Sequence, residues 1–296
     1  MRVNIAIGEP LALIRDDGGM DVDSPASRTA LGAARHRAVH QVLEGGSVFR
    51  DPLAVPVLGI PEAELQAPDD DRRMRYFIAA RQRYAEDLLA DAVARGVDQL
   101  VVLGAGLDTF AYRNPYAGLR VVELDHPATQ AWKRECLAAA SIEVPASVTH
   151  APIDFERDDL GTVLDRYVDT RSSVLFWWLG VTPYLTIEAI TATLTVLGAL
   201  AHSAVVLDHR APRPTDLSPE ARAWAAAREA RVASVGEPWL SQLAPKEVTD
   251  LLLGCGFEHA EVADEVALVR RVLGLPPSTE PRVTHLAWGS TGWPTT

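Results

Sequence analysis

Two glycines and one aspartate have the types and spacing of a nucleoside-binding site. The apolar run 101–103 leads into Gly104, Ala105 and Gly106, and Asp125 closes a second apolar run nineteen residues after Gly106. In a Rossmann-like sheet, glycines after the first strand let the backbone approach a ligand, and an acid after the second strand accepts hydrogen bonds from ribose hydroxyls. The spacing therefore predicts a site for a nucleoside-bearing cofactor.

The residues after the glycines favour one kind of cofactor. A dinucleotide fingerprint needs a third glycine where this chain has Thr109, and Asp108 would place negative charge beside a diphosphate. S-adenosylmethionine has no phosphate and carries a cationic sulfonium and ammonium, so it suits the acidic loop better. The alternatives are a nicotinamide-dependent oxidoreductase, a cofactor-binding protein without activity, and a simple strand-to-helix turn.

Composition narrows the class of protein. The 296 residues are 48% hydrophobic and 23% charged, which is typical of a folded globular chain. The net charge of −12 disfavours nucleic acid as a partner, since binding to phosphates needs a basic face. We expect a cytoplasmic protein, a monomer or homodimer, that acts on a small molecule, because no signal peptide or membrane span is visible and only Cys136 and Cys255 could pair.

The elements that must position the site alternate from residue 99 onward. This alternation predicts an α/β fold built on a mainly parallel, Rossmann-like sheet. The expected strands are 99–103, 119–124, 147–152, 173–178, 203–208, 258–263 and 283–288. The expected helices between them are 127–140, 157–168, 186–200 and 245–255.

Two regions lie outside this alternation. Residues 1–98 are predicted to form a helical N-terminal cap, with helices from 27 to 44 and from 71 to 95, on a core of residues 99–296. The proline-containing segment 211–244 follows the fifth strand, so we expect an insertion at the carboxyl edge of the sheet, where it would form part of the substrate wall.

Together, these segments resemble the leucine carboxyl methyltransferase family, including its bacterial natural-product branch. The resemblance implies a class I methyltransferase fold with a helical N-terminal cap and S-adenosylmethionine as the methyl donor. The similar pieces occur in the family's order at residues 29–38, 49–52, 80–84, 103–109, 112–113, 123–127, 154–155, 180–185 and 236–238.

The resemblance also assigns roles at the cofactor. Arg81 would hold the methionine carboxylate, for which a guanidinium is the best bidentate partner, although it could instead be a solvated helix residue. Gly104, Ala105 and Gly106 would bring the backbone close to the cofactor. Asp108 could pair with Arg113 beneath this loop.

The nucleoside end is assigned to two further pairs of residues. Asp125 would bind the ribose diol, with His126 next to it in the cofactor site. Asp154 would accept the adenine amino group with Phe155 beside the ring, or else Asp154 caps the helix that follows.

One position departs from the family. Family members usually have an acid immediately before Gly180, near the ammonium group of the cofactor, and this chain has Leu179. Leucine accepts no hydrogen bond, so backbone carbonyls or another acid must satisfy the ammonium. One of the neighbouring Trp177 and Trp178 could face the sulfonium, while core packing is expected for at least one, because they alternate along a strand.

The acceptor determines whether a base is needed. The resemblance favours O-methylation of a carboxylate, which is already anionic at neutral pH. C- or N-methylation of an aromatic, such as an indole-type intermediate, would need a base, for which His209 and Tyr184 are candidates. We also expect Trp178, Tyr184, Arg83 or Arg228 in the substrate site, with both arginines alternatively solvated.

No metal is expected. His36 and His40 have the spacing of one helix face, but no carboxylate motif accompanies them, so a packed or solvated pair is favoured. The acidic run 69–71 is better explained as the start of the long helix, where negative charge suits the helix dipole.

Overall fold

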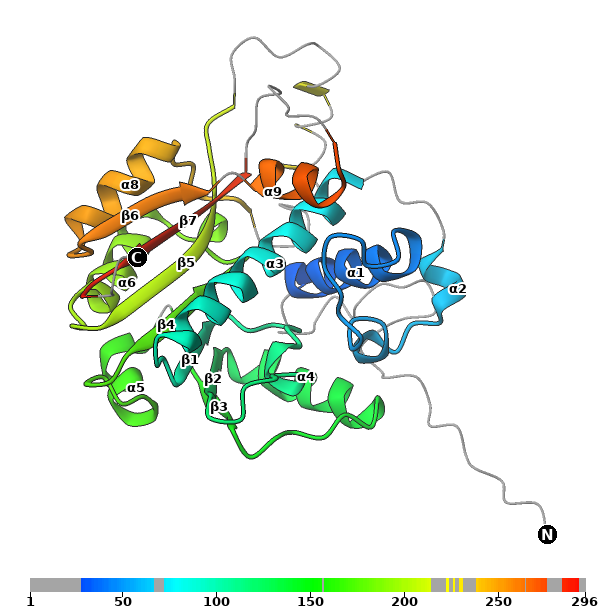
Figure 1. Ribbon diagram of the computed structural model, residues 1–296, viewed down its shortest axis with the longest axis horizontal. Helices are drawn as coiled ribbons and strands as arrows, with labels where there is room; N and C mark the ends of the chain where they lie inside the picture. The colour runs from blue at the N-terminus through cyan, green and yellow to red at the C-terminus, as the bar shows by residue number, and fades with distance from the viewer. Residues whose placement is uncertain are drawn as a thin grey trace.

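A seven-stranded sheet with the order β3-β2-β1-β4-β5-β7-β6 forms the centre of the protein (Figure 1). The computed structural model describes residues 28–66, 72–155, 157–213, 222–223, 226, 229–230, 238–263, 265–275 and 284–292. The strands are β1 (Gln99–Leu103), β2 (Arg120–Asp125), β3 (Val148–Pro152), β4 (Val174–Trp178), β5 (Ser203–Arg210), β6 (His259–Ala263) and β7 (Thr284–Ser290).

The strand directions are those of a class I methyltransferase sheet. Strands β1 to β5 pair in parallel, and β7 is antiparallel to both β5 and β6. The expected strands are confirmed to within one or two residues at each end, with β5 extending two residues further, to Arg210. The carboxyl ends of β1, β2, β4 and β5 therefore meet at one edge of the sheet.

Helices cover both faces of the sheet. Before β1 come α1 (Arg28–Leu43), α2 (Glu62–Leu65) and α3 (Arg72–Ala94). The helices between or after strands are α4 (Pro127–Ala139), α5 (Leu160–Tyr167), α6 (Ile187–Gly198), α8 (Pro245–Gly254) and α9 (Glu265–Val272), and the short 3-10 turns are η1 (Pro56–Leu58), η2 (Phe110–Tyr112) and η3 (Thr182–Tyr184). The sequence did not predict α9, which packs on α3 with Leu268 buried against Ala79 and Ala80.

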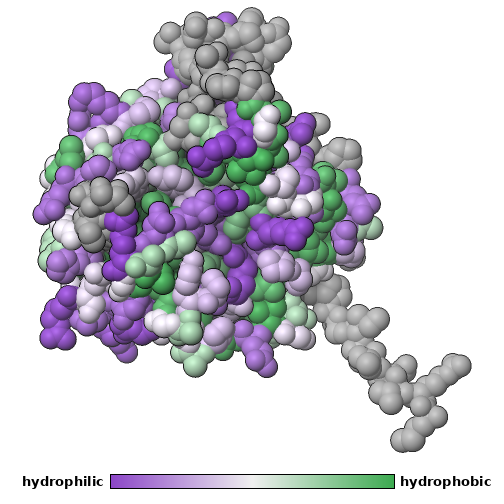
Figure 2. Space-filling view, viewed as in Figure 1, coloured by the Kyte–Doolittle hydropathy of each residue, from purple (hydrophilic) through white to green (hydrophobic). Residues whose placement is uncertain are grey.

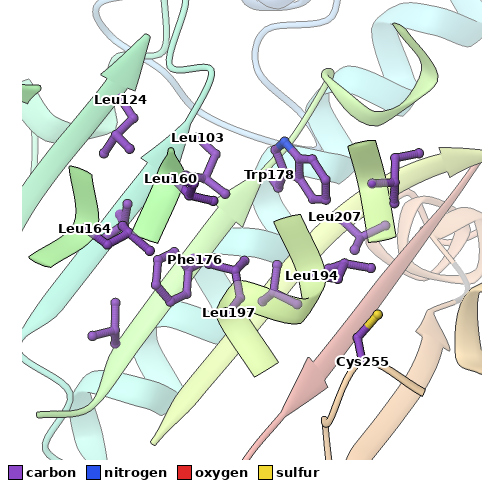
Figure 3. Packing of buried hydrophobic residues seen from close by; sticks show 14 of the residues in the cluster. Leu103, Leu124, Leu160, Leu164, Phe176, Trp178, Leu194, Leu197, Leu207 and Cys255 are labelled. Atoms are coloured by element: carbon purple, nitrogen blue, oxygen red, sulfur yellow. The ribbon is translucent and has the colours of Figure 1, made fainter. Parts of the chain in front are cut away.

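Alternation along the strands separates two cores. On one face, Ala85 and Leu89 of α3 pack on Leu100 and Trp177 of the sheet. On the other face, α5, α6 and α8 cover a core that includes Phe176 and Trp178 (Figure 3). Figure 1 shows α3 lying across the front of the sheet, with α1 and α2 beside it.

Apolar side chains are scattered over the surface of the described residues. Figure 2 shows hydrophilic and hydrophobic residues intermingled on one face of the molecule. The large hydrophobic residues that stay exposed come from separate elements and are Leu43, Val144, Ile187, Leu240, Leu253 and Leu275. No described helix combines the length and apolarity that a membrane crossing requires.

A buried carboxylate, Asp51, joins the N-terminal helices to the segment after the glycines. Its oxygens lie 2.7 Å from Nε of Arg37 on α1 and 3.4 Å from Nε of Arg113 at the end of η2. Thr109 donates its hydroxyl hydrogen to Asp51 over 2.6 Å. Arg113 also pairs with Glu86 of α3. The expected Asp108–Arg113 pair is therefore not formed, and Asp108 instead accepts the Phe110 N–H at 2.7 Å.

We expect Asp51→Ala to lower the free energy of unfolding by about 3–5 kcal/mol, because the change removes the carboxylate that the buried Arg37 pairs with and one of the two that Arg113 contacts. Urea unfolding followed by circular dichroism measures this loss. Asp87→Ala is the matched control, since it removes one carboxylate from the exposed Arg83–Asp87 pair and should cost less than about 0.5 kcal/mol. Equal unfolding midpoints for the two variants would contradict the assigned role of Asp51.

Candidate functional site

The glycine turn after β1 is held tightly against three neighbouring segments. The N–H groups of Gly104 and Ala105 both donate to the Leu124 carbonyl, at 2.8 and 3.2 Å. A Cβ atom on Gly104 would lie 2.5 Å from Val181, and one on Gly106 would lie 2.9 Å from Ala30 of α1. Both glycines have positive φ, at +69° and +46°. Glycine is needed here by backbone conformation and by close packing.

Asp125 lies directly beside this turn. One carboxylate oxygen accepts the Gly106 N–H at 2.6 Å and the other accepts the His126 N–H at 2.7 Å. Burial raises the pKa of Asp125, while these two N–H groups oppose that shift. Carboxylate oxygens have two lone pairs each, so Asp125 retains acceptor sites for a ligand. His126 is exposed and caps α4, because its Nδ1 accepts the Ala128 N–H at 3.2 Å.

Arg81 is buried, which excludes the alternative that it is a solvated residue on the surface of its helix. It is 8% exposed, and its Nη1 lies 3.0 Å from the Oδ2 atom of Asp208 on β5. The other oxygen of Asp208 accepts the Gly180 N–H. A Cβ on Gly180 would lie 2.9 Å from Arg81 Nη1, so this glycine makes room for the guanidinium. The buried Nε of Arg81 has no hydrogen-bond partner among the described residues.

Asp154 and Phe155 follow β3 at the same edge of the sheet. The helix-cap alternative for Asp154 is wrong, because α5 begins later and is capped by Asp159, which accepts the Thr162 N–H at 2.8 Å. Asp154 is partly buried and lies 3.6 Å from Arg157. Phe155 packs against the core and lines a cavity of about 180 Å³ between α5 and α6.

The two tryptophans of β4 are both core residues. Trp178 is fully buried and lies near Leu103 and Leu207, with its indole nitrogen unpartnered in the described part of the chain (Figure 3). Trp177 points to the opposite face, where its ring contacts Phe110 edge-on at 4.9 Å between centroids. Core packing therefore accounts for both tryptophans.

His209 is buried at the end of β5, so the alternative of a surface residue is wrong. Its Nδ1 is 2.9 Å from the Leu243 carbonyl, and its ring stacks on His285 with centroids 5.4 Å apart. Burial, followed by the nearby His285, lowers the pKa of His209 to about 4. The imidazole is thus neutral at pH 7, with an Nδ1–H that donates to Leu243 and an Nε2 without a described partner. Tyr184 is the last residue of η3, which follows β4 in the chain, and it is partly buried.

The structure does not bring Arg83 to this edge. Arg83 lies on the exposed side of α3, where it pairs with Asp87 at 3.0 Å. Arg228 and most of the expected insertion 211–244 lie outside the described residues.

The described end of that insertion is bound to the carboxyl edge of the sheet. Leu240 N–H donates to the Pro183 carbonyl at 2.7 Å, and Leu243 N–H donates to the Arg210 carbonyl at 2.7 Å. These bonds fix segment 238–244 against η3 and the end of β5.

Sequence reasoning missed two charged residues of β5. Asp208 contacts Arg81, and Arg210 places its guanidinium 3.3 Å from the centroid of the Trp239 ring and 3.7 Å from Glu229. The sequence does contain a signal for both, because charged residues at the end of an otherwise apolar strand lie at the ligand-binding edge of a doubly wound sheet. Within the described residues, no group of three or more His, Cys, Asp or Glu side chains is arranged to hold a metal.

Comparison with known proteins identifies the family. The model of the leucine carboxyl methyltransferase family matches residues 30–198. A protein of Mycolicibacterium paratuberculosis named "Putative S-adenosyl-L-methionine-dependent methyltransferase" is 33% identical over 221 residues, covering 68% of this chain and 70% of that protein. A protein of Mycobacterium tuberculosis with the same name is 27% identical over 300 residues, which cover 92% of this chain and 84% of that protein.

Among solved structures, a "putative methyltransferase" from Thermobifida fusca matches with a TM-score of 0.54 at 18% identity, covering 86% of this chain and 94% of that one. At this identity the likeness shows the fold alone. The family model spans more than half of the chain in sequence, and it includes the glycine turn, Asp125 and Arg81. The chain therefore belongs to the leucine carboxyl methyltransferase family of S-adenosylmethionine-dependent methyltransferases.

Proposed function

We propose that this enzyme methylates a carboxylate oxygen of a small metabolite, with S-adenosylmethionine as donor. The observation that carries the choice of acceptor is the neutral, buried His209, whose pKa is lowered to about 4. Such an imidazole is a weak base at pH 7, whereas a carboxylate acceptor is already anionic and needs no base. Membership of a methyltransferase family sets aside the nicotinamide-dependent oxidoreductase.

The described residues fit this cofactor. The Nε of Arg81, which has no partner among the described residues, is a buried donor for the methionine carboxylate. The glycine turn holds its backbone next to Asp125, which keeps acceptor sites for the ribose hydroxyls. Asp154 and Phe155 follow the neighbouring strand, where we place the adenine. We assign Tyr184, at the end of η3, to the wall of the acceptor site.

In this mechanism the protein acts chiefly by positioning. When bound, the cofactor supplies an electrophilic methyl group on a sulfonium. Arg81 would hold the amino-acid end of the cofactor and Asp125 its ribose, and the segment 238–244 is bound to the carboxyl edge of the sheet beside η3. Holding donor and acceptor atoms in line while water is excluded can lower a barrier by about 7–11 kcal/mol.

The nature of the acceptor atom can be tested directly. We expect the enzyme, given methyl-labelled S-adenosylmethionine and a panel of carboxylic acids with their matching primary amides, to label only acids. The label should leave as methanol after mild alkali, because alkali hydrolyses a methyl ester but not an N- or C-methyl group. Label that resists alkali would contradict carboxylate methylation, and calorimetric binding of NAD in preference to S-adenosylhomocysteine would contradict the cofactor.

The pKa of His209 predicts a pH dependence of stability. The unfolded histidine titrates near pH 6.5 and the folded one near 4, so the unfolded state binds a proton first as the pH falls. The free energy of unfolding should therefore fall by up to about 3 kcal/mol between pH 6.5 and pH 4. Urea unfolding across this range should show a shallower loss for His209→Gln than for the wild type.

His202→Gln is the control, because this exposed histidine immediately precedes the same strand and should leave the pH profile unchanged.

With a carboxylate acceptor, His209→Gln should also keep kcat within about threefold, since no proton is removed. A general base would instead account for about a 10²–10⁴-fold loss, and a loss of that size would contradict the proposed acceptor.

A further inference from the structure

The apolar residue at position 179 has an acidic neighbour on the adjacent strand. Strands β4 and β5 pair in parallel, with Trp177 opposite Val206 and Trp178 opposite Leu207. One further step of this register sets Leu179 beside Asp208. Leu179 packs with the core beneath α3, and Asp208 reaches Arg81 of α3, so both lie on the same face of the sheet.

The carboxylate of Asp208 on β5 contacts both α3 and the turn after β4. Asp208 is 2% exposed, with one oxygen 3.0 Å from Arg81 Nη1 and the other accepting the N–H of Gly180. Gly180 is the residue that follows Leu179. Asp208 therefore binds the turn on which an acid at position 179 would lie. Its oxygens retain lone pairs for another donor.

We propose that the Arg81–Asp208 pair is the receptor for the zwitterionic amino-acid end of the cofactor, with Asp208 taking the place of the acid absent at position 179. Arg81 would bind the carboxylate, and Asp208 would accept from the ammonium. This assignment rests on the cofactor of the proposed function and not on the acceptor.

The chemistry of the pair matches both charges of such a ligand. A guanidinium presents several N–H donors, of which Nη1 is used by Asp208 and the buried Nε has no described partner. Before a ligand binds, each charge neutralises the other, so neither is buried alone. A zwitterion then adds an anion next to the cation and a cation next to the anion, without changing the net charge of the site.

Three other buried or partly buried carboxylates of this part of the fold are already engaged elsewhere. Asp51 pairs with Arg37 and Arg113, and Glu86 pairs with Arg113. Asp125 accepts two backbone N–H groups at the glycine turn, on the far side of β1 from β5. Asp208 is the carboxylate with which Arg81 forms its described ion pair.

Two ligands separate this role from simple packing. S-adenosylhomocysteine carries the amino-acid end, whereas methylthioadenosine has the same nucleoside without it. We expect Asp208→Asn to weaken S-adenosylhomocysteine about 10- to 100-fold by calorimetry, the range for losing a charge-assisted hydrogen bond, and to change methylthioadenosine binding less than about threefold. Equal effects on both ligands, or no effect on either, would overturn the proposal.

Relocating the acid tests the register argument. Leu179→Glu in the Asp208→Asn background should recover at least about tenfold of the lost affinity for S-adenosylhomocysteine, because it returns a carboxylate to the adjacent register position. Failure to recover affinity in a folded double variant would overturn the assignment of Asp208 to the position of the missing acid.

Controls distinguish the possible failures. Glu86→Gln removes another carboxylate of α3, the partly buried one that pairs with Arg113, and should lower the melting temperature while leaving the ratio of the two affinities unchanged. If Asp208→Asn does not fold, the wild type is titrated with the analogue of S-adenosylhomocysteine that lacks the amino group, and less than about tenfold weakening overturns the proposal. A wild type that binds neither nucleoside overturns the cofactor assignment itself.

Discussion

The arrangement of the site depends on the buried carboxylate of Asp51. Three other parts of the chain meet through it: Arg37 of α1, Thr109 and Arg113 after the glycine turn, and, through Arg113, Glu86 of α3. Two arginines share this buried acid, so a shift of any one helix would leave a charge unpaired, which is expensive in a protein interior. The network thereby fixes α1 over the glycine turn and sets the position from which α3 extends Arg81 toward β5.

The sequence predicts well those features that depend on local patterns. Buried strands are short apolar runs, and the glycine turn and Asp125 have the spacing typical of nucleoside-binding sheets. Both could therefore be located before the fold was known. The Arg81–Asp208 pair joins residues 127 positions apart. Its prediction requires the register between β4 and β5 and the rotation of α3, which no local pattern contains. Helix α9 is eight residues long and depends on packing against α3, so its periodicity is brief.

Side-chain direction explains why several candidates lie near the site without facing it. Arg81 and Arg83 are two residues apart on a helix and therefore point to different sides, one toward Asp208 and the other toward Asp87 at the surface. Trp177 and Trp178 face opposite cores for the corresponding reason on a strand. A sequence motif can place the backbone of a site correctly while leaving the direction of each side chain to the tertiary fold.

The charges around the site suit the transfer of a methyl group from a cation to an anion. In such a reaction a positive and a negative charge both disappear as the ester forms, so surroundings of low polarity favour the transition state over the separated ions. In the proposed reaction the buried, uncharged His209 supplies such surroundings at the end of β5. The Arg81–Asp208 pair adds no net charge beside it. A protonated His209 would add a positive charge that stabilises the anionic acceptor more than the transition state, which gives the lowered pKa of this histidine a role in the proposed reaction.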